Sequence, residues 1–562
     1  MTNDAPTTTD AASPAPTTSQ VRSAGAAAFA RGAAAWHRIE PWLASIGDRL
    51  NPILVKETRQ SLKSWQFTLT FVLLLVTCWV VTIGGVAWVG PSIYYAAAGG
   101  SMLLAYYVLL AGLLIVFVPY SAFRSLTAER EDNTYELLSI TTLRSRQIIS
   151  GKLGSAVAQM LVYFSAITPC LAFTYLLRGV DLPTIVLLLV YTFLVSLALS
   201  LLGLVFGALQ VQKFGQAFLA VGFVGLLLMF LVWTIQAAFM MITTGYVVVS
   251  SSEFWIANLA IATAYVTTFA LVYYAAAALI SFPSENRSTP LRLMMVVQQT
   301  AWIGWIAYLA FADNLDEVMV TGAAVAGGAY WYLMGSMLTG ERPEMSRRAR
   351  RDLPQSLWGR ALFTWLFPGP ASGYMFVVAN LTAIAFMYVA TLFSLAALIP
   401  TAGNSLWTEL FALVILGWSY LVAYLGLGRL LITVLRRVAK VTMLAAVLIN
   451  FLLLLAGSGI PMIIQMMSVD LRKSGYTLLQ VTNPFYTLYT VARGELPSDA
   501  TVPLMAVPAA AVCVLLLNLP AVVRELQQVR VAAPQRVLDD DAELLSPPPG
   551  PSSPWDTPEQ TA

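Results

Sequence analysis

Long uninterrupted runs of apolar residues recur along most of the chain. A helix needs roughly 20 apolar residues to cross about 30 Å of hydrocarbon, whereas membrane β-strands alternate apolar and polar residues. These runs do not alternate, and none contains Asp, Glu, Lys, Arg or His. They predict twelve transmembrane helices, at 67–90, 97–120, 153–177, 184–208, 217–241, 256–281, 294–312, 318–338, 375–398, 410–428, 441–466 and 502–523.

The composition supports this prediction. Of the 562 residues, 58% are apolar and 11% are charged, whereas soluble domains carry about a quarter charged residues. Three cysteines are too few for a disulfide-stabilised secreted protein. The expected fold class is therefore all-α, a polytopic membrane protein of about twelve transmembrane helices, which could form two six-helix units.

The distribution of basic residues predicts the topology. If the N-terminus is cytoplasmic, 28 of the 32 Lys and Arg residues lie in cytoplasmic segments. Only Arg178, Arg472, Lys473 and Arg493 lie outside. This bias follows the positive-inside rule. We expect a multi-pass protein of the plasma (bacterial inner) membrane with both termini cytoplasmic.

The two ends of the chain differ from the rest. Residues 1–35 are rich in Ala, Thr, Pro and Ser, and residues 533–562 are acidic and then Pro-rich. Both compositions are typical of disordered segments, so we expect two disordered cytoplasmic tails. No short apolar core with an early cleavage site opens the chain, so the first span is expected to direct insertion.

The spans lack the residues that most membrane chemistry needs. Ionisable residues inside a membrane mark proton paths, redox sites and intramembrane proteases, and the predicted spans have none. The single histidine, His37, precedes them and does not suggest a metal site. Ser150-Gly151-Lys152 lacks the earlier glycine of a phosphate-binding loop, because position 146 is Arg. We therefore expect no catalytic residue, no cofactor, no metal and no nucleic-acid partner.

Residues 48–66 have the pattern of an amphipathic helix. Asn51 suits the N-cap and Pro52 the first helical position. On a helical wheel the apolar residues, with Trp65 among them, occupy one half, and Lys56 and Arg59 lie on the other. This pattern predicts an interfacial helix on the inner leaflet that contacts membrane lipid. An ordinary basic flank of the first span is the alternative.

The segment 121–152, between the second and third spans, concentrates both acidic and basic residues. Thr134, Leu137 and Leu138 suggest a short helix with one apolar edge. That edge is too short to span a membrane, so we expect it to dock on the inner ends of the spans or on a separate protein.

At these two places the sequence resembles the ABC-2 type permease family, the membrane subunits of certain ABC transporters. The resemblance covers the first six spans, 67–281. It rests on the Asn51-Pro52 opening and on motifs in and after the loop: Glu129-Arg130, Thr134, Glu136-Leu137-Leu138, Thr141, Leu143 and Gly151-Lys152-Leu153. Asn133 and Thr142 stand where the family often has Gly and Pro.

The resemblance implies a permease subunit that moves an unidentified substrate with ATP hydrolysed by a separate ABC ATPase. It also implies that the loop contacts this ATPase through Glu129, Arg130, Thr134, Glu136, Leu137, Leu138 and Leu143. The chain could pair with a second copy or with another permease. The alternative is a non-transporting membrane scaffold or assembly factor that retains the fold.

The remaining spans, 294–523, repeat the layout of the first six but not their motifs. A long basic loop at 339–374 follows the second of these spans, and it lacks the Glu-Leu-Leu and Gly-Lys-Leu patterns. Asn483-Pro484-Phe485 is similar to a pattern before the last span of the family. This region is either a degenerate second permease unit or a set of accessory spans.

Overall fold

The chain is an all-α, multi-pass membrane protein. The computed structural model describes residues 51–91, 95, 97–131, 144–209, 213–244, 250–282, 284–312, 317–351, 353–354, 356, 358–359, 363–398, 404–468, 476–493, 501–527, 535, 536, 539 and 542. Within these residues there is no strand, and twelve helices are long and apolar enough to cross a membrane. Each of the twelve coincides with one predicted span, which confirms the predicted fold class.

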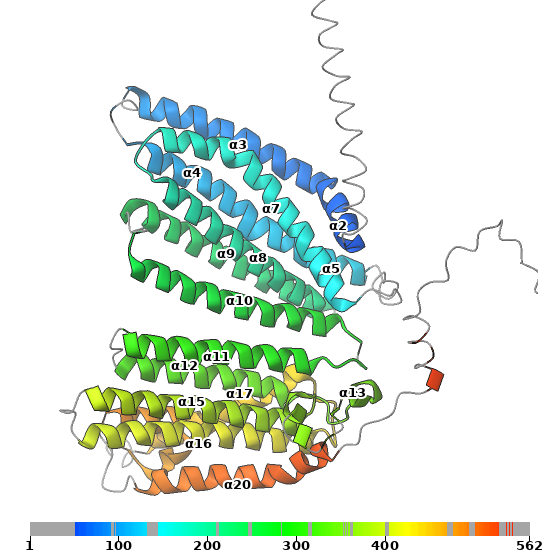
Figure 1. Ribbon diagram of the computed structural model, residues 1–562, viewed down its shortest axis with the longest axis vertical. Helices are drawn as coiled ribbons and strands as arrows, with labels where there is room; N and C mark the ends of the chain where they lie inside the picture. Colours follow the sequence, from blue (N-terminus) through cyan, green and yellow to red (C-terminus); the bar gives the residue numbers. More distant parts are fainter. Residues whose placement is uncertain are drawn as a thin grey trace, which may run out of the picture. The chain divides into compact units, whose positions relative to one another are not determined.

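The chain divides into two compact units, Met1–Val247 and Val248–Ala562 (Figure 1). The boundary therefore follows the fifth span instead of the sixth. The sixth spanning helix, α10 (Ser252–Ile280), packs against α11 (Ser288–Ala312) and groups with the second unit. The sequence places this helix at the end of the first six-span group, but its contacts place it with the later spans.

The described residues of unit 1 form a short helix and five spans. The short helix α2 (Pro52–Leu62) leads directly into α3 (Trp65–Val89). The second span contains α4 (Gly99–Ala111), the π-helical segment η2 (Gly112–Phe117) and α5 (Val118–Glu131). The remaining spans are α7 (Ser145–Leu176), α8 (Leu182–Ala208) and α9 (Lys213–Thr244).

The π-helical segment of the second span is stabilised by a neighbouring helix. A π turn inserts one extra residue and displaces carbonyl groups from their usual partners. The hydroxyl of Ser196 on α8 donates a hydrogen bond to the carbonyl of Leu114 within this segment. The second span thus continues as one helix from Gly99 to Glu131, well beyond the length that crosses hydrocarbon.

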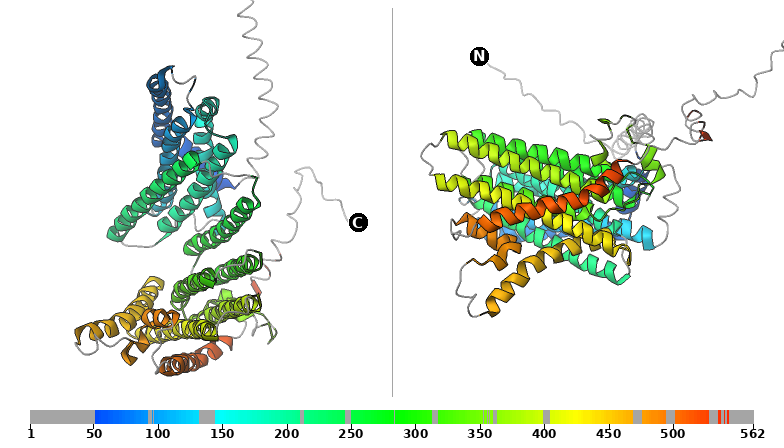
Figure 2. Two further views of the ribbon diagram at one scale, coloured as in Figure 1. Left: turned by 90° about the vertical axis from the view of Figure 1, so that its left-hand side faces the viewer. Right: turned by 90° about the horizontal axis from the view of Figure 1, so that it is seen from below.

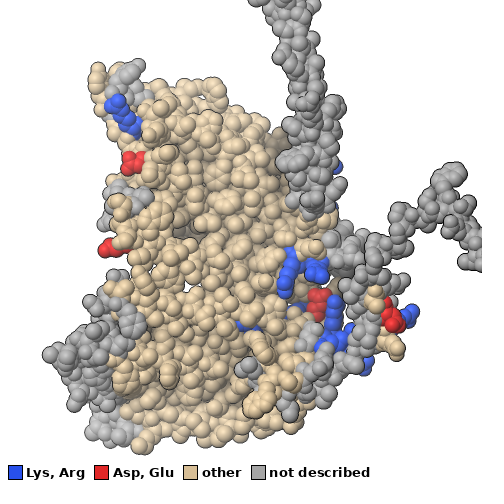
Figure 3. Space-filling view, viewed as in Figure 1, with Lys and Arg blue, Asp and Glu red and all other residues tan. Residues whose placement is uncertain are grey.

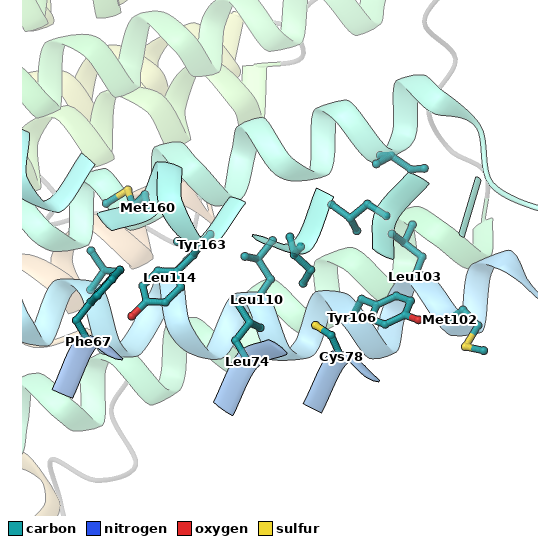
Figure 4. Close-up of a cluster of buried hydrophobic side chains, with 14 of the residues drawn as sticks. Phe67, Leu74, Cys78, Met102, Leu103, Tyr106, Leu110, Leu114, Met160 and Tyr163 are labelled. Carbon is teal, nitrogen blue, oxygen red and sulfur yellow. The ribbon is translucent and has the colours of Figure 1, made fainter. Parts of the chain in front are cut away.

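One hydrophobic core cluster of unit 1 lies between α3, α4 and α7 (Figure 4). Tyr106 and Tyr163 are fully buried there, and each places its hydroxyl within 2.7 Å of a threonine hydroxyl on α3, Thr82 and Thr70 respectively. These hydrogen bonds satisfy polar groups that would be costly to leave unpaired in an apolar core. They also tie the outermost helix α3 to the rest of the unit.

The described residues of unit 2 form seven spans and several short helices, which Figure 2 shows from two further sides. After α10 and α11 come α12 (Glu317–Leu338), α13 (Arg347–Arg351) and the 3-10 helix η3 (Thr364–Leu366). The later elements are α15 (Pro370–Leu398), α16 (Asn404–Leu435), α17 (Met443–Met467), the 3-10 helix η4 (Leu478–Thr482), α19 (Pro484–Ala492) and α20 (Thr501–Leu526).

The packing order of unit 1 recurs in unit 2. In unit 1, α4 and its continuation α5 pack against α3, α7, α8 and α9; α7 also contacts α3 and α8, and α8 contacts α9. In unit 2, α12 packs against α11, α15, α16 and α17; α15 also contacts α11 and α16, and α16 contacts α17. Taken in chain order, five spans of each unit therefore make the same set of helix pairs.

Candidate functional site

The short helix α2 begins as the sequence predicts and ends earlier. The Asn51 side chain accepts a hydrogen bond from the amide of Ile53 at 3.1 Å, and Pro52 occupies the first helical position. The helix stops at Leu62, because the Ser64 side chain caps α3 by accepting from the amide of Phe67. Trp65 is therefore the first residue of the first span and not part of α2.

The start of α2 is fastened to the start of α7. The Asn51 side-chain amide donates to the carbonyl of Gln147, and lies 3.3 Å from the hydroxyl of Ser150. One residue thus caps α2 and also holds it against the third span. This contact joins positions 96 residues apart in the chain.

Two glycines let α2 approach α7 closely. A Cβ added at Gly151 would lie 2.8 Å from the Cβ of Ile53, and one at Gly154 would lie 2.6 Å from Cδ1 of Leu54. A side chain at Gly151 would push the helices apart, because the Cβ of Ile53 and the backbone nitrogen of Leu54 cannot move aside, whereas at Gly154 the end of the Leu54 side chain would have to shift. The apolar face of α2 is therefore used against protein, whereas the sequence analysis had placed it on the membrane.

A buried lysine connects three elements of unit 1. The ammonium group of Lys152 on α7 lies 3.1 Å from Oε1 of Glu57 on α2 and 2.9 Å from Oε1 of Glu129 on α5. Its side chain is 1% exposed, and those of the two acids are 10% and 13% exposed. A buried cation is tolerable only when it is paired and hydrogen-bonded. Lys152 therefore holds α2, α5 and α7 together.

We name this region the α2–α5–α7 corner: Asn51, Pro52, Ile53, Lys56, Glu57, Glu129, Ile148, Gly151 and Lys152. A pocket of about 200 Å³ lies in it. Lys56 reaches its rim, 4.0 Å from Glu129, and is 60% exposed. The two acids and two lysines balance in charge, so the corner offers no net charge to a small ion. In the part of the chain that the structure describes, no group of three or more His, Cys, Asp or Glu residues could hold a metal ion.

The structure brings part of the predicted site together. Glu129 and Arg130 form the end of α5, next to the start of α7. Lys56 and Arg59 lie exposed on α2. The other predicted contact residues, Thr134, Glu136, Leu137, Leu138 and Leu143, lie outside the described residues.

Unit 2 contains a buried ion pair that the sequence analysis missed. Arg292 near the start of α11 is fully buried, and its Nη2 lies 2.7 Å from Oε2 of Glu341. Its guanidinium also donates to the carbonyl oxygens of Trp365 at 2.6 Å and Gly369 at 3.1 Å. Like Lys152, it connects separate elements of its unit, because Glu341 follows α12, Trp365 lies in η3 and Gly369 precedes α15.

A second acid secures the start of α15. Glu525, near the end of α20, accepts hydrogen bonds from the amides of Ala371 at 3.0 Å and Ser372 at 2.7 Å. A carboxylate at a helix N-terminus pairs with amides that have no partner inside the helix. The last span of the unit is thereby tied to the start of its α15.

The sequence alone gives little indication that the basic residues of these ion pairs are buried. Lys152 immediately precedes the predicted third span, and Arg292 lies two residues before the predicted seventh. Basic residues just before a span are usually interpreted as contacting lipid headgroups. In the space-filling view Lys and Arg do gather on the surface near α13, while much of the visible helix surface is uncharged (Figure 3). Only the packing separates the buried cations from the exposed ones.

Comparison of the chain with protein-family models, with curated proteins and with solved structures finds no match. The functional argument therefore depends on the geometry of the corner and on the residues that compose it.

Proposed function

We propose that this protein is the membrane-spanning permease subunit of an ABC transporter of the ABC-2 type, driven by ATP hydrolysis on a separate ATPase. The observation that carries the proposal is the α2–α5–α7 corner. Three motifs behind the sequence resemblance meet there: Asn51-Pro52, Glu129-Arg130 and Gly151-Lys152, the first of which is distant in the chain from the other two. Unrelated sequence matches would have no reason to converge on one place.

The corner suggests how force from a partner could reach the spans. The predicted ATPase contact begins at Glu129 and continues to Leu143. If the ATPase displaced this segment, Glu129 would move with it, and Glu129 is paired with Lys152 on the third span. The displacement would also act on the second span directly, because α5 is the end of that span. Movement of one loop would therefore displace two spanning helices and α2 together.

The repeated packing order supports a degenerate second permease unit more than a set of accessory spans. Accessory helices would have no reason to reproduce the helix pairs of α3, α4, α7, α8 and α9. The motifs of the first unit are not repeated with them, so ATPase contact is assigned to the loop of unit 1.

The first experiment is co-purification of the full chain from its native membrane in mild detergent, with the bound proteins identified by mass spectrometry. An ATPase with a phosphate-binding loop is expected. The purified chain alone is expected to hydrolyse no ATP. ATP hydrolysis by a clean preparation of this chain, abolished by substitutions in it, would contradict the assignment of ATP hydrolysis to a separate ATPase subunit.

The second experiment tests the contact segment. Leu137→Asp or Glu136→Lys should leave membrane abundance unchanged and abolish partner binding and transport, because loss of a buried interface anchor costs about 2 kcal/mol or more. Charge reversal among Arg347–Arg351 is the matched control and should do less. Normal abundance with undiminished ATPase binding in Leu137→Asp would end this assignment.

The alternative function, a membrane scaffold that retains the fold, predicts a different result. A scaffold would co-purify with other membrane proteins and would not need an ATPase. If the segment 129–143 packs on the chain's own inner surface, the same variants should be degraded. Measuring abundance beside partner binding separates these outcomes.

A further inference from the structure

A basic groove follows the outer face of α2. Lys56, Arg59 and Lys63 are exposed and spaced so that they share one side of the helix. With Pro52, Val55 and Gln60 they line an open groove of about 500 Å³. Among the described residues Arg59 and Lys63 form no ion pair. The groove therefore presents positive charge that the described part of the protein does not neutralise.

The adjoining helix α3 presents an apolar surface. Only 11% of its most apolar stretch is buried within the protein. Trp65, Leu69 and Leu73 are 76%, 53% and 61% exposed, and they follow one another along the helix at a spacing that keeps them on one side. In a membrane this side contacts acyl chains.

The two surfaces are adjacent at the junction of the helices. Lys63 is separated from Trp65 by one residue, and tryptophan at the end of a span lies at the level of the headgroups. A lipid whose chains lie along α3 therefore has its phosphate beside Lys63 and Arg59. The opposite face of α2 is occupied by α7, so the basic face is the one that points outward.

We propose that Arg59 and Lys63, with Lys56 at the groove's far end, bind the phosphate of an anionic glycerophospholipid whose acyl chains lie along α3. An acidic protein surface would also match the charge, but it would not use the apolar side of α3 that begins at the groove. The proposal concerns lipid binding alone and does not depend on the proposed transport function.

Lys56 connects the lipid-binding groove with the α2–α5–α7 corner. Its ammonium group lies between the groove and Glu129, at 4.0 Å from the latter. A phosphate in the groove would draw Lys56 away from Glu129, while the ion pair between Glu129 and Lys152 would remain. Lipid binding would thus change the contacts of Glu129 in the α2–α5–α7 corner without any change in the spanning helices themselves.

The test uses the full chain purified and delipidated in mild detergent. Dioleoyl-phosphatidylglycerol or dioleoyl-phosphatidylcholine is then added, and bound lipid per chain is counted by native mass spectrometry. The variant is Arg59→Gln/Lys63→Gln, which spares Lys56 because of its contact with Glu129. The control is Arg437→Gln/Lys440→Gln, which removes two exposed basic residues at the turn between α16 and α17.

We expect wild type and control to retain phosphatidylglycerol in preference to phosphatidylcholine. The α2 variant should bind phosphatidylglycerol about thirtyfold more weakly, since each basic residue contributes roughly fivefold near an anionic headgroup. This preference should weaken with added salt. A headgroup-reactive phosphatidylglycerol should cross-link to peptides from 51–70 in wild type.

Three results would overturn the proposal. One is undiminished phosphatidylglycerol binding by the α2 variant. Another is an equal loss in the control, which would show general attraction to basic residues. The third is a variant that keeps its lipid and loses a protein partner, which would assign the groove to that partner. Melting temperatures without lipid show whether the variant is folded.

Discussion

Lys152 on the third span and Glu129 at the end of the second form a buried ion pair, with 2.9 Å between Nζ and Oε1. The same ammonium group lies 3.1 Å from Glu57 on α2. One cation therefore serves two acids from separate helices. Its removal would leave both carboxylates largely buried and without this cation.

Replacement of Lys152 by Met should destabilise unit 1 strongly. Breaking a buried ion pair by removing one partner costs about 3–5 kcal/mol, because the remaining charge stays buried. Thermal unfolding of the purified protein measures this. Lys56→Met is the control and should cost less than about 1 kcal/mol, since an exposed pair contributes little. Adding Glu57→Gln to Lys152→Met should recover part of the loss. Equal melting temperatures for the two lysine variants would contradict the assigned role.

Replacement of Gly151 by Ala should weaken the packing of α2 on α7. The added Cβ would meet the Cβ of Ile53 at 2.8 Å and the backbone nitrogen of Leu54 at 3.1 Å, and neither atom can rotate away. We expect a loss of about 1–3 kcal/mol in thermal unfolding experiments, typical of overpacking.

Two other glycines are matched controls for this substitution. Gly154→Ala should cost less, because its nearest neighbour is the flexible end of the Leu54 side chain. Gly222→Ala on α9 meets nothing within 4 Å, and alanine favours a helix over glycine by about 0.5–1 kcal/mol. If Gly151→Ala behaved like Gly222→Ala, the close approach of α2 would not matter for stability.

Replacement of Arg292 should destabilise unit 2, and lysine should not restore it. Arg292 contacts a carboxylate and two main-chain carbonyls at once, and a planar guanidinium has donors that an ammonium group lacks. We expect Arg292→Met to cost about 3–5 kcal/mol and Arg292→Lys to remain clearly less stable than wild type. Arg348→Gln, which removes an exposed partner 3.6 Å from Glu285, is the control. Full stability in Arg292→Lys would show that charge alone matters there.

The topology prediction can be tested by cysteine labelling in whole cells. Twelve spans and cytoplasmic termini place Ser346 inside and Asn314 outside; Asn314 is not among the described residues. An impermeant reagent should reach a cysteine placed at 314 and fail to reach one at 346 until the membrane is opened. The reverse pattern would invert the whole arrangement, and reaction at both positions would change the number of spans.

The sequence was sufficient for the features whose cause is local. The length of an apolar run decides whether a helix can cross a membrane, so all twelve spans could be predicted without knowing their neighbours. The start of α2 was equally local, because Asn51 and Pro52 act within one turn. The residues that resemble a known family could also be read from the chain, though not the fact that they meet.

Tertiary structure alone decided which charges are buried and which surface α2 covers. A helical wheel shows that Ile53 and Leu54 share an apolar face, but protein and lipid are both apolar, so the pattern cannot say which one covers it. Lys152 and Lys63 are both lysines at the edge of a span, yet one lies between two acids and the other is exposed. That difference arises from contacts of Lys152 with residues 23 and 95 positions away in the chain, Glu129 and Glu57, and no local pattern records it. The same holds for α10, whose apolar surface fits either group of spans and whose place in unit 2 is decided by its packing on α11.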